Sequence, residues 1–169
     1  NVFVGRNPAD RFNPESGGAW GRTKAGYAVN LAGKGHVVCF NSLSHFWDGL
    51  NVFTNSLADP ELGQQSRAID FYNNDIYNCT DNFIETDGGY ANIRVLRNRS
   101  FNCMGAPLSV QPVYCGPVYW IRNVTYNAHK GTQAFKMSGG DNVVLYHNTS
   151  TCHYNVRGGA VYLDARNNL

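Results

Sequence analysis

Three acidic side chains lie close together in the segment TDNFIETDGG, which contains Asp81, Glu85 and Asp87 within seven residues and no basic residue. Glu85 and Asp87 are two positions apart on a predicted strand, so both point to one face of it, about 7 Å apart. Paired carboxylates at that separation serve as general acid and base, or as ligands for calcium. The segment therefore predicts either acid–base catalysis by Glu85 and Asp87 or a calcium site formed by Asp81, Glu85 and Asp87.

A basic residue and several polar or aromatic residues are expected on the same face. Lys136 occupies the equivalent outward position two predicted strands from Glu85, roughly 10 Å away, where it could serve as a catalytic base. Aromatic faces also stack on sugar rings. The candidate substrate-binding residues are Asn51, Phe53, Gln111, Tyr162, Asp164 and Trp47. Because outward residues of any soluble sheet are polar, the alternative is an ordinary solvated surface.

An internal repeat indicates which elements position these side chains. An Asn recurs five times in a fixed context, and a second Asn follows four residues after three of them. The five are Asn41, Asn74, Asn98, Asn123 and Asn148, at intervals of 33, 24, 25 and 25 residues. The longer first interval holds a polar stretch over residues 59–66, which predicts a loop inserted into one repeat.

Each repeat contains two strand-like stretches separated by Gly, Asn and Asp. In one stretch, apolar residues such as Trp120 lie three and five positions before the recurring Asn, which predicts one buried face. The other stretch carries apolar pairs such as Leu108 and Val110, and its outward positions include Glu85 and Lys136. Short strands without intervening helices predict a β-solenoid whose coils stack at about 4.8 Å, with the Asn amides hydrogen bonded from coil to coil.

This pattern resembles the right-handed parallel β-helix, or pectate lyase-like, superfamily from about Gly26 to Leu169. The resemblance implies an all-β fold of about six coils of ~25 residues, with a polysaccharide lying along the outward face of one sheet. In the family's lyases, a cation or calcium neutralises a uronate carboxylate while Lys, Arg or His removes the adjacent proton. We therefore expect a polysaccharide or glycan partner, calcium as the candidate cofactor, and secretion or display at the cell surface.

Composition limits the remaining classes of protein and partner. The chain has 169 residues, of which 43% are hydrophobic and 15% charged, and its net charge is +2. These values exclude a disordered chain and a strongly basic nucleic-acid binder, and no apolar run reaches the ~20 residues that span a membrane.

We expect one domain over residues 1–169, a fragment of a longer chain whose residues 1–25 form an irregular first coil. Because no capping helix is predicted, the ends could pair with other copies, end to end or side by side.

Other residues admit both a structural and a functional explanation. The five cysteines have no metal-binding spacing and are expected to be mostly buried thiols. Four Asn sequons fall on recurring Asn positions, where a buried amide could not carry a glycan. Arg97, Arg122 and His147 each precede a recurring Asn and form a basic column, which is either a solvated edge or a second surface for an anionic glycan.

Two functions of different class follow from these residues. The first is a carbohydrate-active enzyme that acts on an acidic polysaccharide, a lyase rather than a glycoside hydrolase. A hydrolase would need two or three carboxylates from adjacent coils, and only Glu85 and Asp87, from one strand, meet that description. The second is a non-catalytic glycan-binding or structural module of the adhesin or tailspike type.

Overall fold

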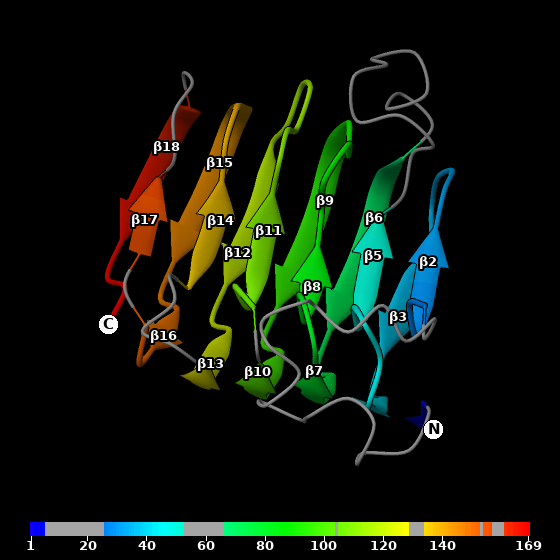
Figure 1. The fold of residues 1–169 in the computed structure, drawn as a ribbon. Helices are drawn as coiled ribbons and strands as arrows, with labels where there is room; N and C mark the ends of the chain where they lie inside the picture. Colours follow the sequence, from blue (N-terminus) through cyan, green and yellow to red (C-terminus); the bar gives the residue numbers. More distant parts are fainter. Residues whose placement is uncertain (6–25, 53–65, 104, 129–133, 153, 157–160) are drawn as a thin grey trace.

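β-Strands are the only regular secondary structure in the part of the chain that the structure describes. The computed structural model describes residues 1–5, 26–52, 66–103, 105–128, 134–152, 154–156 and 161–169. These residues form eighteen strands in three six-stranded parallel sheets (Figure 1). No helix occurs among them, and hence none long and apolar enough to cross a bilayer. The predicted all-β class is confirmed.

Each repeat of the chain contributes one strand to each of the three sheets, here called A, B and C. Sheet A consists of β1 (Val2–Val4), β4 (Ser42–Ser44), β7 (Asp75–Cys79), β10 (Arg99–Cys103), β13 (Val124–Ala128) and β16 (Thr149–Ser150). Sheet B consists of β2 (Val29–Leu31), β5 (Leu50–Val52), β8 (Ile84–Glu85), β11 (Leu108–Val110), β14 (Phe135–Met137) and β17 (Tyr154–Val156). Sheet C consists of β3 (Val37–Cys39), β6 (Arg67–Tyr72), β9 (Ala91–Leu96), β12 (Val118–Ile121), β15 (Gly140–Tyr146) and β18 (Val161–Arg166).

Every strand pairs with the strand one repeat away, in parallel. In sheet C, for example, Val95 pairs with Trp120, and Trp120 pairs with Leu145. The chain thus advances from β1–β3 at one end of the molecule to β16–β18 at the other (Figure 1). This arrangement is consistent with the predicted parallel β-solenoid.

Sheet A is the part of the architecture that the sequence pattern did not reveal. Its strands follow the recurring Asn directly, and their inward residues include Ser100 and Thr125, each 2% exposed. The hydroxyl groups of these two residues are hydrogen bonded to each other at 2.9 Å, which satisfies them inside the protein. Because polar residues occupy these inward positions, the alternation of apolar and polar residues that marks a strand is weak here.

The core lies between the three sheets and contains the apolar residues predicted to point inward. Phe71, Val95 and Leu145 of sheet C are buried, as are Leu108 and Phe135 of sheet B. Trp120, predicted as a core residue, is fully buried and meets the Phe135 ring edge to face, with the ring centroids 5.1 Å apart. The cysteines are free thiols, and Cys79 and Cys103 are buried in this core.

The recurring Asn side chains form a continuous buried ladder. The Oδ1 atom of Asn123 accepts hydrogen bonds from the backbone N–H and the Nδ2 of Asn98, at 3.0 and 3.1 Å. The Nδ2 of Asn123 in turn donates to Oδ1 of Asn148 and to the carbonyl of Val95. Each interior amide therefore makes four hydrogen bonds, which is its full capacity. The burial of Asn98, Asn123 and Asn148 confirms the structural explanation of their sequons.

The ladder is longer than the sequence repeat predicted. Asn1 donates from Nδ2 to Oδ1 of Asn41, and Asn148 donates to Oδ1 of Asn168. These end members were missed because they lie 40 residues before Asn41 and 20 residues after Asn148, outside the regular period. The second set of recurring Asn forms a partly exposed ladder, in which Asn127 donates to Asn102, Asn102 donates to Asn78, and Asn78 is bonded to His45.

The prediction that Tyr162 and Asp164 lie on the same face as Lys136 was wrong. Both residues belong to β18 of sheet C, where Asp164 pairs with Val144. The position next to Lys136 in sheet B is taken by Asn155 of β17. The error has a physical origin, because the apolar pair Val161 and Leu163 resembles the sheet B pattern, whereas β18 precedes ladder residue Asn168 and so belongs to sheet C.

Removing one interior rung should destabilise the whole stack. In Asn123→Ala, the backbone N–H and the amide of Asn98 both lose their acceptor in a buried position, which should lower the free energy of unfolding by about 3 kcal/mol. The measurement is urea unfolding followed by circular dichroism. Asn127→Gly, in the exposed ladder at a backbone φ of 55° that Gly adopts without strain, is the control and should cost less than about 1 kcal/mol. Equal losses in the two variants would contradict the role of the buried ladder.

Candidate functional site

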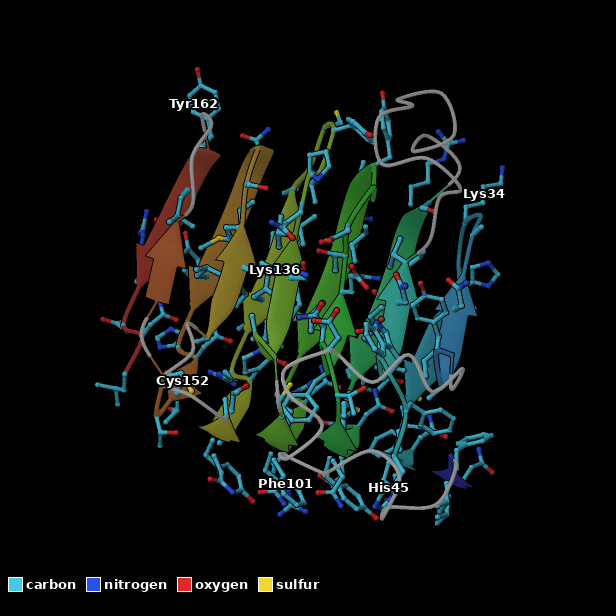
Figure 2. The ribbon with its side chains drawn as sticks, in the orientation of Figure 1. Lys34, His45, Phe101, Lys136, Cys152 and Tyr162 are labelled. Atoms are coloured by element: carbon cyan, nitrogen blue, oxygen red, sulfur yellow. The ribbon has the colours of Figure 1, made fainter. Side chains whose placement is uncertain are left out.

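In sheet B, the outward positions of four successive strands pair with one another, from Asn51 to Lys136. Asn51 pairs with Glu85, which pairs with Ser109 of β11. Ser109 pairs in turn with Lys136 of β14. Lys136 therefore stands two strands from Glu85, as predicted, and Figure 2 shows it over the middle of sheet B.

Glu85 and Asp87 share a hydrogen bond, although Asp87 lies just beyond the end of β8. Asp87 is 4% exposed, and its Oδ1 accepts a 2.7 Å hydrogen bond from Oγ of Ser109. Burial raises the pKa of Asp87 well above its ordinary value, and the charge and hydrogen bond of Glu85 raise it further. Asp87 therefore keeps its proton to a higher pH than an ordinary carboxyl does, and donates it to Glu85.

Asp48 is a second buried carboxyl at this site, and the sequence analysis missed it. It lies just before β5, is 2% exposed, and accepts a 2.7 Å hydrogen bond from the backbone N–H of Asn82. Burial, together with the charges of Glu85 and Asp81, raises the pKa of Asp48 to about 8. Asp48 is therefore largely protonated at neutral pH.

The position of Asp48 relative to the strands of sheet B could have revealed it from the sequence. Leu50 pairs with Ile84, and Ile84 pairs with Leu108, so the residues two positions earlier are also equivalent. Those residues are Asp48 and Asn82, with Ala106 in the next repeat. The candidate residues predicted on the outward face lay within or after the strands of sheet B, so the residues that precede these strands were not considered.

Asp81 adds a partly exposed carboxyl from the segment before β8. Burial raises its pKa, the charge of Lys136 opposes that rise, and Glu85 adds to it. The backbone also approaches Asp81 closely, since a Cβ atom on Gly105 would lie 2.6 Å from the Asp81 carbonyl oxygen and 2.9 Å from its Oδ1. A glycine at position 105 therefore permits the close packing that holds Asp81.

Lys136 is tied to the carboxyl groups through Asn82. The Nζ of Lys136 donates to Oδ1 of Asn82 at 3.2 Å, and Nδ2 of Asn82 donates to the carbonyl of Ala106. The backbone N–H of the same Asn82 binds Asp48. Lys136 lowers the pKa values of Asp48, Asp81 and Asp87 by its charge, so it lies within electrostatic range of all three.

The predicted substrate-binding residues do not lie together in the structure. Asn51 is only 3% exposed, and Gln111 donates to Oγ of Ser138 at the edge of the same sheet. Trp47 is half-buried in the segment before β5, whereas Phe53 lies outside the described residues. Tyr162 is in β18 of sheet C, and Figure 2 shows its side chain at the far end of the molecule, away from Lys136.

The residues near Glu85 do not form a preassembled calcium site. Calcium takes six to eight oxygen ligands, mostly unprotonated carboxylates and carbonyls. Among the described residues, no group of three or more His, Cys, Asp or Glu side chains could hold a metal ion. The proton of Asp87 and its hydrogen bond to Glu85 also compete with a cation for the same oxygens. Calcium binding by Asp81, Glu85 and Asp87 remains a prediction.

Together, these residues form a cluster of four carboxyl groups and one ammonium group. Asp81 and Glu85 are partly exposed, while Asp48 and Asp87 are buried behind them with raised pKa values. Tyr27, which is 38% exposed, has a raised pKa because of burial and the nearby charges of Asp48, Glu85 and Asp81. Such a cluster can donate a proton from one carboxyl and accept one at another.

Comparison with known proteins adds no assignment. No family model matches the sequence, and neither a curated protein nor a solved structure matches it.

The raised pKa of Asp48 predicts how stability depends on pH. The folded protein binds the Asp48 proton more tightly than the unfolded chain does, so this group's contribution is complete below its unfolded pKa and is lost as pH rises to about 8. Asp48→Asn mimics the protonated form. It should match wild type near pH 4 and exceed its stability progressively up to pH 8, by as much as about 5 kcal/mol.

The measurement is urea unfolding between pH 4 and pH 8. Asp75→Asn is a matched control, because Asp75 is a partly exposed carboxylate paired with Arg99 on sheet A. This control should show no gain that increases with pH. A constant difference between Asp48→Asn and wild type at every pH would contradict protonation of Asp48 in the folded state.

Proposed function

We propose that this protein is a glycoside hydrolase that cleaves an extended polysaccharide lying across sheet B. One observation carries the proposal: two partly exposed carboxyl groups, Asp81 and Glu85, lie within electrostatic range of each other and close to two buried carboxyls whose pKa values are raised. Glycosidic-bond hydrolysis needs one carboxyl that gives a proton and another that acts as base or nucleophile.

Asp81 is the general acid in this proposal, and Glu85 is the base or nucleophile. Burial favours the protonated form of Asp81, which suits a group that must give its proton to the leaving oxygen. Glu85 accepts the hydrogen bond from the protonated Asp87, which fixes the orientation of the Glu85 carboxyl group. Asp81 therefore suits the role of proton donor, and Glu85, within electrostatic range of it, supplies the second carboxyl that hydrolysis requires.

The buried groups act through these two residues. Asp87 binds Glu85, and Ser109 fixes the orientation of Asp87. Asp48 accepts a hydrogen bond from the backbone of Asn82, the residue next to Asp81. Lys136 donates to the side chain of the same Asn82. We regard Asp48, Asp87, Asn82 and Lys136 as positioning residues, because they set the geometry and charge of Asp81 and Glu85.

Hydrolysis fits this cluster better than the lyase reaction expected from the sequence. That expectation depended on finding only two carboxylates, both from one strand. Asp81 supplies a second partly exposed carboxyl besides Glu85, and the buried Asp48 from the preceding repeat lies within electrostatic range of both. A lyase must instead neutralise a uronate carboxylate, and the ammonium of Lys136 already donates to Asn82 in a cluster rich in acidic groups.

The fold supports an elongated substrate. Parallel strands about 4.8 Å apart repeat their outward positions along sheet B, and a sugar chain running across them would meet the partly exposed Glu85 of β8 and Lys136 of β14. We further propose that the solenoid is right-handed, with about six coils of ~25 residues, as in the pectate lyase-like superfamily that it resembles. Action on such a polymer outside the cell accords with secretion or surface display.

The deciding experiment distinguishes hydrolysis from elimination and from binding alone. Purified protein is incubated with pectate, alginate, chondroitin and neutral glycans, and both new reducing ends and ultraviolet absorbance of unsaturated products are measured. Hydrolysis produces reducing ends without the absorbance. Unsaturated products would establish a lyase and overturn the proposal. Retention on an immobilised glycan without any cleavage would establish a binding module instead.

On the substrate that is cleaved, Glu85→Gln and Asp81→Asn should each lower kcat by about 10²- to 10⁴-fold, because each removes a group that transfers a proton. The rate is followed by the release of reducing ends. Asp75→Asn removes a carboxylate on sheet A and should leave kcat unchanged within about twofold. Retention of full activity by Glu85→Gln would exclude Glu85 from the chemistry.

A further inference from the structure

A second group of charged side chains lies away from the sheet B cluster, at the corner between sheets C and A. Arg97, Arg122 and His147 occupy this corner in three successive repeats, each just before a ladder Asn, and all three are exposed. We call them the basic edge. The strands on either side pair in register, so the three residues recur at the strand spacing of about 4.8 Å.

The positive charge of the basic edge is not neutralised by the protein's own carboxylates in the part of the chain that the structure describes. Three other arginines on sheets A and C are each paired with a carboxylate, whereas no ion pair joins Arg67 of β6 to a described acidic residue. The pairs are Arg94 with Asp70, Arg99 with Asp75, and Arg166 with Asp164. No ion pair joins Arg97, Arg122 or His147 to any described acidic residue. The remaining described side-chain carboxyls are those of the sheet B cluster.

The fold does not require basic residues at this corner. The backbone there has a positive φ, at 52° for Arg97 and 57° for Arg122 and His147. Phe40, Asn73 and Asn167 occupy the same corner in other repeats, at 55°, 52° and 51°. Asn adopts this left-handed conformation more readily than Arg does. Two arginines in strained positions that Asn also fills are better explained by a ligand than by the fold.

The neighbouring outward face of sheet A offers a row of aromatic side chains. Tyr77, Phe101 and Tyr126 stack almost parallel, with ring centroids 5.0 and 5.3 Å apart. Phe101 and Tyr126 follow Arg97 and Arg122 by four residues, whereas Tyr77 follows Asn73 and no aromatic ring follows His147 at this position. Arg99 lies on the same face of β10 as Phe101, and Figure 2 shows Phe101 along this side of the molecule. Because the rings stack on one another, they present their edges and hydroxyl groups to a ligand.

We propose that the basic edge binds a linear anionic polysaccharide, extended parallel to the stacking direction of the strands. Each sugar residue of an extended pyranose chain advances by nearly one strand spacing, so a carboxylate or sulfate on each sugar can meet successive cations. Phosphates of one nucleic-acid strand recur about every 3.4 Å along a duplex, which does not match. This site is separate from the sheet B cluster and does not depend on the proposed hydrolase activity.

The test measures affinity for defined polymers by isothermal titration calorimetry at low salt and at about 0.15 M salt. The probes are polygalacturonate, chondroitin sulfate, dextran and double-stranded DNA. Binding to at least one of the two acidic polysaccharides, more tightly than to DNA and without binding to dextran, is expected. No binding to either acidic polysaccharide, or tighter binding to DNA, would overturn the proposal.

Variants then locate the binding surface. The double variant Arg97→Asn and Arg122→Asn removes two charges with a residue that the corner accepts, and should weaken binding about tenfold or more. The control is Arg94→Gln with Arg166→Gln, which removes the same charge from paired arginines and should weaken binding less than about threefold. Equal effects of the two double variants would overturn the proposal. Unfolding midpoints establish that both variants are folded.

Discussion

The buried amide ladder is the interaction on which the rest of the structure depends. Each interior Asn makes its full set of hydrogen bonds only when its neighbours in both adjacent repeats are in register. A shift of one residue would leave buried amides and backbone N–H groups without partners, which is costly inside a protein. The ladder therefore fixes the pairing of sheets A and C on either side of it. The apolar core can then pack behind strands whose register is already determined.

Burial has opposite consequences for polar groups in the ladder and in the sheet B cluster. An amide carries no charge, so the ladder is satisfied completely by hydrogen bonds. Carboxyl groups such as Asp48 and Asp87 are stable in the same kind of environment only when they hold a proton, and burial raises their pKa values for that reason. Proteins seldom retain such groups for stability alone, which makes the cluster the strongest functional feature of sheet B.

The sequence predicted the fold well and the site in part, and the difference has a physical cause. Residues that repeat, such as Asn98 and Trp120, leave a periodic signal because the same packing recurs in every repeat. Asp48 occurs in one repeat only, so no period reveals it, and only the pairing of Leu50 with Ile84 places it beside Asn82. Tyr162 was misplaced because a short apolar alternation does not tell one sheet from another.

One consequence concerns how the architecture tolerates changes in length. Each ladder residue needs only a neighbour of the same kind, so deleting or duplicating a whole repeat would leave every rung with a partner. The sheet B cluster is different, because Asp48, Glu85 and Lys136 come from separate repeats and are matched to one another. The number of repeats can therefore vary without loss of the scaffold, whereas the proposed chemistry requires one particular order of repeats.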